Sequence, residues 1–225
     1  GKLKMRIYAM LNPTDENMDY FVIKGLYTTP SLTVRSIKLY ADGALGSRGA
    51  CLLQSYNDAD HQGFMVNEDD YFQKYCRLGY ENGYQVCTHA IGDSANRYIL
   101  HLYASYLKKS NDLRWRIEHC QVVDKTDINL FGKYNIIPSV QTTHATSDMY
   151  WAEQRLGPLR IKNAYAYKSL MEQNKWYPNG SDFPVESINP IYGFYAAVYR
   201  KDHKGFPNDG FQTENAVTRL QALQA

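Results

Sequence analysis

Four side chains that could do chemistry lie at or near the ends of separate short apolar runs of the sequence: Lys38, His89, His119 and Asp182. Imidazole and carboxylate groups are good ligands for zinc or a similar divalent ion, and a carboxylate can also move protons. Each residue also has an ordinary explanation of its own: a hydrogen-bonded histidine, a turn-forming aspartate, or a lysine that reaches the surface. The set therefore predicts a metal site only if the fold brings its members together.

The runs that precede these residues alternate with helical patterns. Six short apolar, β-branched or aromatic runs predict strands, namely Lys4–Leu11, Ser36–Tyr40, Tyr84–Thr88, Arg114–Glu118, Ile136–Gln141 and Trp176–Gly180. The intervening and following stretches predict helices, namely Glu68–Glu81 with Asn67 as its N-cap, Ser94–Lys109, Lys125–Lys133, Lys162–Gln173, Pro190–Tyr199 and Thr213–Ala225. Alternating strands and helices imply parallel strands with helical crossovers. We expect an α/β domain, either a barrel or an open doubly wound sheet, whose strands end on one face.

The composition excludes several classes of protein. The 225 residues include 25 basic and 23 acidic side chains, so a formal net charge of +2 gives no argument for nucleic acid or an anionic membrane surface. None of the four cysteines forms a C-x-x-C pair, which argues against a zinc knuckle and a redox dithiol. No apolar run reaches the roughly 18 residues of a membrane span. These values suit a single globular domain.

Five strings in this order resemble the amidohydrolase superfamily: Ser36–Arg48, His89–Asp93, Arg116–His119, Gln141–Asp148 and Gly180–Glu186. They are most similar to the branch that includes N-substituted formamide deformylase, and the match covers nearly the whole chain. The resemblance implies a (β/α)8 TIM-type barrel with one or two divalent metals, of which zinc is the expected one. It also implies four metal ligands: His89 on the fifth strand, His119 on the sixth, Asp182 on the eighth, and Lys38 on the fourth, which many members carry as a metal-bridging carbamate.

One motif of the superfamily is absent. The first strand should carry an H-x-H pair, but no two of the six histidines are separated by one residue; they are His61, His89, His101, His119, His144 and His203. We therefore expect residues 1–225 to be a fragment of the catalytic barrel domain, with strands three to eight but without strands one and two and the small β-sandwich. Such a fragment would have unpaired sheet edges and would be inactive by itself.

The function implied by the resemblance is hydrolysis of amide-like C–N bonds, other than peptide bonds, by a metal-activated hydroxide. Asp182 would accept a proton from the nucleophile and pass it to the leaving nitrogen. Ser47 and Arg48 lie on a polar segment, 43–67, that follows a strand and could contact the substrate. His144 could donate to a developing oxyanion. The plainer alternatives are a surface arginine and a loop histidine without a role.

Other interpretations stay open on the sequence. The chain could be a non-catalytic α/β domain that binds a small molecule, or a barrel remnant kept for oligomer contacts. Barrels of this kind also host deaminases and isomerases, because a fold does not fix a reaction. The expected partners are a small-molecule substrate and, for assembly, a second copy in a homodimer. No targeting segment is visible, so the compartment stays open, with the cytoplasm as the default.

Overall fold

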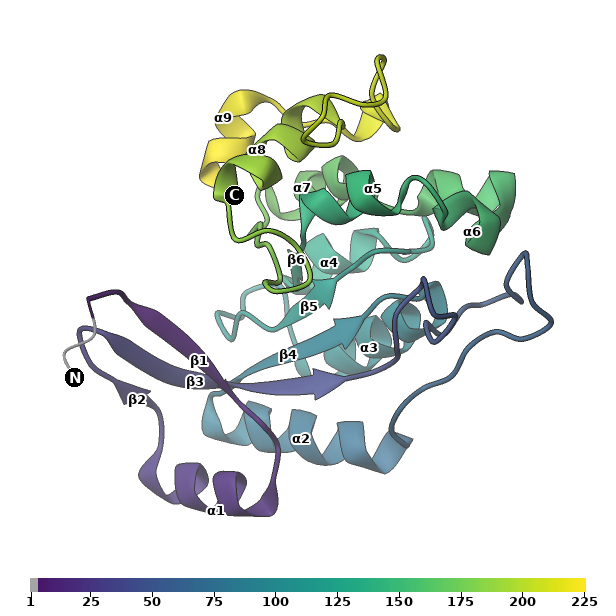
Figure 1. Cartoon of the computed structure of the whole chain (residues 1–225). Coiled ribbons are helices and arrows are strands. Elements are labelled where there is room, and N and C mark those ends of the chain that lie inside the picture. The colour runs from purple at the N-terminus through teal and green to yellow at the C-terminus, as the bar shows by residue number, and fades with distance from the viewer. Residues whose placement is uncertain (1–3) are drawn as a thin grey trace.

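A computed structural model describes residues 4–225, which form a six-stranded sheet with helices around it (Figure 1). Five strands are parallel and follow one another in the order β1 (Ile7–Leu11), β3 (Leu32–Tyr40), β4 (Gln85–Ala90), β5 (Arg116–His119) and β6 (Ile137–Ser139). The short strand β2 (Tyr27–Thr28) pairs antiparallel with β3. Five of the six predicted strands are thereby confirmed. Within the described residues, β1 lies at one end of this order and β6 at the other, so the sheet is open.

Helices after successive strands cover one face of the sheet (Figure 1). They are α2 (Asp69–Asn82), α3 (Asp93–Tyr106), α4 (Asn129–Tyr134) and α7 (Tyr167–Asn174). In α2 the buried residues fall at positions i, i+3, i+4 and i+7, which is one stripe of an amphipathic helix: Phe72, Tyr75, Cys76 and Gly79. The strand β4 is buried along nearly its whole length, as expected for a central parallel strand.

The chain ends in a helical layer that packs beside the last strands. Its members are α5 (Thr142–Asp148), α6 (Ala152–Arg160), a 3-10 turn at Ile161–Asn163, α8 (Pro190–Tyr199), a second 3-10 turn at Thr213–Asn215, and α9 (Arg219–Gln224). In this layer α8 packs against both α5 and α9. No helix of residues 4–225 is long and apolar enough to cross a membrane.

Three helices are absent from the sequence prediction: α1 (Asp15–Lys24), α5 and α6. Only Met18 of α1 is buried, so this helix lacks a clear apolar stripe. The α5 sequence is polar throughout although most of it is buried. In α6, Gly157 and Pro158 look like helix breakers, and the helix does kink at Gly157, where φ is 76°.

Several predicted helix boundaries are wrong. Glu68 is the N-cap of α2, and the predicted cap, Asn67, instead donates its side-chain amide to the Tyr40 carbonyl at 3.1 Å. The predicted helix Lys162–Gln173 divides into a 3-10 turn and α7. The predicted helix Thr213–Ala225 likewise divides, because Thr218 caps α9 and ends the preceding turn.

The predicted strand Trp176–Gly180 is also wrong. Only Asn179 forms a bridge with the sheet, opposite Val140. Backbone hydrogen bonds from Val140 to Pro178 and from Gly180 to Val140, both 3.0 Å long, align the segment parallel to the end of β6. Pro178 has no N–H, so it cannot donate a further backbone hydrogen bond to β6. The segment therefore follows the sheet without becoming a full strand of it.

Candidate active site

A cavity of about 400 Å³ lies where β3, β4 and β5 end. Five of the seven predicted site residues line it: Lys38, His89, His119, His144 and Asp182. Most of its exposed lining surface is apolar, with side chains such as Tyr40, Leu45, Ile91, Trp151 and Val185. A concave, mainly apolar site with a few convergent polar groups is typical of small-molecule binding.

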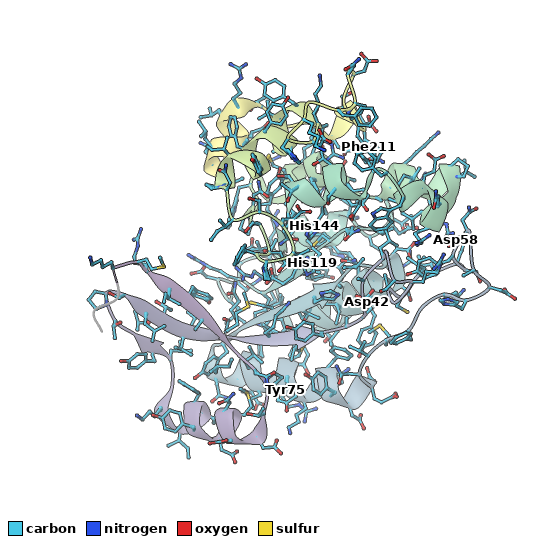
Figure 2. All side chains as sticks on the ribbon, in the orientation of Figure 1. Asp42, Asp58, Tyr75, His119, His144 and Phe211 are labelled. Carbon is cyan, nitrogen blue, oxygen red and sulfur yellow. The ribbon has the colours of Figure 1, made fainter. Side chains whose placement is uncertain are left out.

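Two parts of this lining are built from different elements. The sheet wall comprises Lys38, His89 and His119, which come from the ends of three neighbouring parallel strands. The helix wall comprises His144 and Asp148 on α5 together with Asp182 and Glu186 on the segment that follows Gly180. Figure 2 shows His119 and His144 side by side near the middle of the molecule, where the two walls meet.

The two imidazoles of the sheet wall lie in contact. Their ring centroids are 4.6 Å apart, because His89 lies on β4 and His119 ends the neighbouring strand β5. The backbone of His119 has φ of 79°, in the left-handed region that is unfavourable for residues other than glycine. Its ring Nδ1 lies 2.7 Å from Oε1 of Gln141, within hydrogen-bond distance. The strand end thus holds this imidazole in an uncommon backbone conformation, a feature that is frequent at functional sites.

The environments of His119 and His144 favour the neutral form of their imidazoles. Burial lowers the pKa of His119 well below its usual value, and the neighbouring His89 and His144 lower it further. Burial also lowers the pKa of His144. A neutral imidazole is the form that coordinates a metal. Among the described residues, the buried Nε2 atoms of His89 and His144 have no hydrogen-bond partner, so the bonding capacity of both nitrogens is unfilled.

Lys38 belongs to the sheet wall as well. Burial lowers the pKa of its amine, although the nearby Glu118 carboxylate acts in the opposite direction. Glu118 also accepts a hydrogen bond from the Arg116 guanidinium. The Lys38 Nζ lies 4.6 Å from the centre of the Tyr40 ring. A neutral amine is the form that can react with carbon dioxide, so this environment is compatible with the predicted carbamate.

The acidic groups of the helix wall are held by other hydrogen bonds. Asp148 accepts from the Gln121 amide and the Tyr165 hydroxyl, both at 2.9 Å. Burial, together with the charge of Glu186, raises the pKa of Asp148 to about 7. Glu186 accepts from the Ser147 hydroxyl at 2.6 Å. Asp182 is exposed and has φ of 53°.

The types of donor at this site suit a metal ion better than their present spacing does. Among residues 4–225, no three His, Cys, Asp or Glu side chains stand close enough together to hold a metal ion. The neighbouring imidazoles of His89 and His119 are nonetheless donors of the type that zinc prefers. Asp182 is the predicted third donor, and its segment joins the sheet only through the bridge at Asn179.

Ser47 and Arg48 lie outside the lining of the cavity. Arg48 makes a paired contact with Asp58, with nitrogen–oxygen distances of 3.0 and 2.9 Å. Asp58 also accepts from Arg155 of α6, and Figure 2 shows it at the far end of the long loop. The Ser47 hydroxyl donates to the Ala44 carbonyl at 3.2 Å. A substrate that reached these two residues would have to replace those contacts.

The structure adds two polar residues to the predicted set. Asp42 follows β3 and is buried beside His89, and Gln141 precedes α5 and contacts His119. Asn96 supports them from α3, because its amide donates to the carbonyls of Ala90, Gly92 and Val122. The sequence offered one signal for Asp42, a charged residue at a strand end within a string already singled out. It offered none for Asn96, whose partners are brought together only by the fold.

Two curated proteins align with most of this chain. The chain is 35% identical over 202 residues to "Putative amidohydrolase YtcJ" of Bacillus subtilis (strain 168) and 33% identical over 208 residues to the protein LONG AFTER FAR-RED 3 of Arabidopsis thaliana. Each alignment covers 89% of this chain, but the chain spans only 38% and 36% of the length of these relatives.

Two solved structures have a fold similar to that of this chain. An uncharacterized metal-dependent hydrolase from Pyrococcus horikoshii OT3 superposes with a TM-score of 0.83 at 28% identity, over 97% of this chain and 44% of the other. A mutant of the atrazine chlorohydrolase TrzN from Arthrobacter aurescens TC1, complexed with zinc and atraton, superposes with a TM-score of 0.51 at 11% identity, over 97% of this chain and 46% of the other, which is a likeness of fold alone. The parallel α/β sheet is therefore a partial TIM-barrel type of fold. The profile of the amidohydrolase family matches residues 1–225, and the chain accordingly belongs to the amidohydrolase family.

Proposed function

We propose that this chain forms the metal-binding part of a hydrolase that cleaves amide-like C–N bonds of small molecules. The observation that carries the proposal is the pair of imidazoles in contact, His89 and His119, at the ends of neighbouring parallel strands in one cavity with Lys38 and Asp182. Catalytic residues of barrel enzymes come from the carboxyl ends of several strands. The names of the Bacillus subtilis and Pyrococcus horikoshii relatives, an amidohydrolase and a metal-dependent hydrolase, support the same reaction class.

The ligands in this proposal are His89, His119, Asp182 and Lys38, the last as a carbamate if two ions are bound. Zinc is the proposed ion, because imidazole and carboxylate donors suit it. When bound, such an ion acts as a Lewis acid toward water and a carbonyl oxygen.

The remaining steps fall to side chains of the chain itself. Asp182 accepts a proton from the attacking water at a carboxylate oxygen and then donates it to the leaving nitrogen. The Nε2 of His144 has no hydrogen-bond partner within residues 4–225, so in its protonated tautomer it donates to the oxygen that becomes negative during attack. The N-substituted formamides are the proposed substrate branch, and Ser47 and Arg48 remain predicted substrate contacts. Assembly as a homodimer also stays a prediction.

We further propose that the 225-residue chain has little hydrolytic activity by itself. Asp182 is exposed on a segment that pairs with the sheet at one residue, so its carboxylate is not fixed beside the imidazoles. Geometry of this kind determines rate, because a misplacement of about 1 Å can cost a factor of about a hundred. Zinc-dependent release of amine from small amides by this chain would overturn this point and leave the metal site intact.

The decisive experiment is a zinc titration of the wild-type chain in competition with a chromophoric chelator. His89→Ala and His119→Ala should each weaken zinc binding by at least about tenfold, because each removes a donor. His101→Ala is the matched control, since His101 is exposed on α3, and it should bind zinc like the wild type. Failure of the wild type to bind zinc, or equal binding by all four proteins, would favour a non-catalytic small-molecule-binding domain.

A further inference from the structure

The Asp42 carboxylate is buried between three segments of the chain. Its side chain has no exposed surface, and it accepts hydrogen bonds from the backbone N–H groups of Cys51, Ile91 and Gly92 at 2.8, 3.0 and 2.8 Å. These donors belong to the long loop after β3 and to the turn between β4 and α3. Figure 2 shows Asp42 beside the end of β4. The carboxylate therefore joins two strand ends and the loop that closes the cavity.

The remaining neighbour of this carboxylate is an imidazole of the sheet wall. The Nε2 of His89 lies 3.4 Å from Oδ1 of Asp42 and has no hydrogen-bond partner. A hydrogen bond between these atoms would be about 2.9 Å long, so a movement of about half an ångström would close it. A carboxylate can only accept when ionised, so it can pair with this nitrogen only when Nε2 carries a proton.

We propose that Asp42 is a positioning residue that fixes the tautomer and orientation of His89. Holding the proton on Nε2 leaves the lone pair on Nδ1 for the metal of the proposed function, on which this inference rests. Gln141 acts on the other imidazole through the opposite nitrogen, because its Oε1 accepts from Nδ1 of His119 and leaves Nε2 free. The two neighbouring rings thus present different nitrogens to one ion.

Anchoring of the loop is the competing explanation for Asp42, and the chain offers a matched control for it. Asp93 is also buried and accepts from a backbone N–H of the same loop, that of Leu53, at 2.8 Å. The structure records no ion pair of Asp93 with an imidazole among the described residues. Asp42→Asn and Asp93→Asn therefore both loosen the loop, while only Asp42→Asn alters the partner of His89.

The test uses 15N-labelled histidine in the metal-free chain at pH 8, where long-range proton–nitrogen spectra identify each tautomer. The wild type and Asp93→Asn should both show His89 protonated at Nε2. Asp42→Asn should show a mixture of tautomers, because an amide side chain can donate as well as accept. In the zinc competition, Asp42→Asn should bind about tenfold to a hundredfold more weakly than Asp93→Asn, as expected for the loss of a partner that orients a ligand.

The outcomes separate this inference from the proposed function. Unchanged tautomer and zinc affinity in Asp42→Asn would overturn the role of Asp42 while the metal site stands. A wild-type chain that binds no zinc would overturn the proposed function, and the tautomer of His89 would still decide the inference. If Asp42→Asn does not fold, the wild-type spectrum decides alone, since protonation at Nδ1 of His89 contradicts the proposal.

Discussion

The sheet wall and the helix wall of the cavity differ in how their backbone is held. Behind the sheet wall, Asp42 and Asn96 each make three hydrogen bonds to backbone groups at the strand ends. The helix wall carries Asp182 on a segment that leaves the sheet after a single bridge. Phe183 and Val185 on this segment are 62% and 70% exposed. The sheet wall is fixed from inside the core, whereas the segment of the helix wall that carries Asp182 lies at the surface.

This difference in backbone support makes the two walls suitable for different roles. Metal ligands need positions that are set before the metal arrives, and buried polar groups with all their partners supply such positions. A group that transfers protons and meets substrate belongs to a segment with few buried contacts, because such segments open at low cost. Of the residues in the proposed function, His89 and His119 lie in the sheet wall, and Asp182, the proposed proton carrier, lies on the exposed segment of the helix wall.

The largest expected effect comes from a glycine-to-alanine substitution made once behind the sheet wall and once in the segment of the helix wall. Gly92→Ala would place a Cβ only 2.0 Å from the Cys51 carbonyl oxygen, which lies on backbone and cannot move aside. We expect a loss of about 4 kcal/mol of unfolding free energy from this clash. Gly180→Ala in the helix-wall segment meets nothing within 4 Å and should stay within about 0.5 kcal/mol of the wild type. Urea unfolding measures both, and equal losses would remove the contrast.

The pH dependence of Asp148 sharpens the description of the helix wall. Burial raises its pKa to about 7, whereas an unfolded aspartate titrates at about 3.9. The folded state binds more protons between these values, so stability falls as pH rises from about 4 to 7. The full effect above pH 7 is about 4 kcal/mol or less.

Asp148→Asn removes this titration and tests the sign. Relative to the wild type, its unfolding free energy should rise from pH 4 to pH 8, on top of a constant loss from the weakened contacts with Gln121 and Tyr165. Urea unfolding at both pH values gives the difference. A difference that is constant with pH would mean that Asp148 is ionised without cost and that the helix wall is more open than the structure indicates.

A smaller effect is expected where the long loop meets α6. Arg160 donates to the carbonyls of Gln54 and Ser55 at 3.0 and 2.7 Å. Arg160→Met keeps the aliphatic stem but loses these bonds, so we expect a loss of about 1 kcal/mol. Arg77→Met, on the exposed surface of α2, is the control and should change little. A loss no larger than that of the control would show that the two Arg160 bonds add nothing to the stability of the loop.

Much of the fold followed from periodicity in the sequence. The five parallel strands were predictable because buried strands are apolar runs bounded by turn residues, and α2 because its apolar stripe and Gly83 are local signals. The helix α5 was not predictable, since its polar side chains are buried only after β6 and α8 have packed around it. The last predicted strand was wrong because pairing depends on a neighbour as well as on the run itself.

The sequence by itself determined which residues could do chemistry and the order in which strands present them. Lys38, His89 and His119 follow from residue type and strand position, since parallel strands end on one face. Only the tertiary structure decided that Asp42 faces His89, that Gln141 faces His119, and that Arg48 turns to Asp58. These contacts join residues from separate segments, and their formation depends on distances that no local pattern encodes. Residue type is a property of the chain, whereas hydrogen-bond partners and pKa shifts are properties of the packed core.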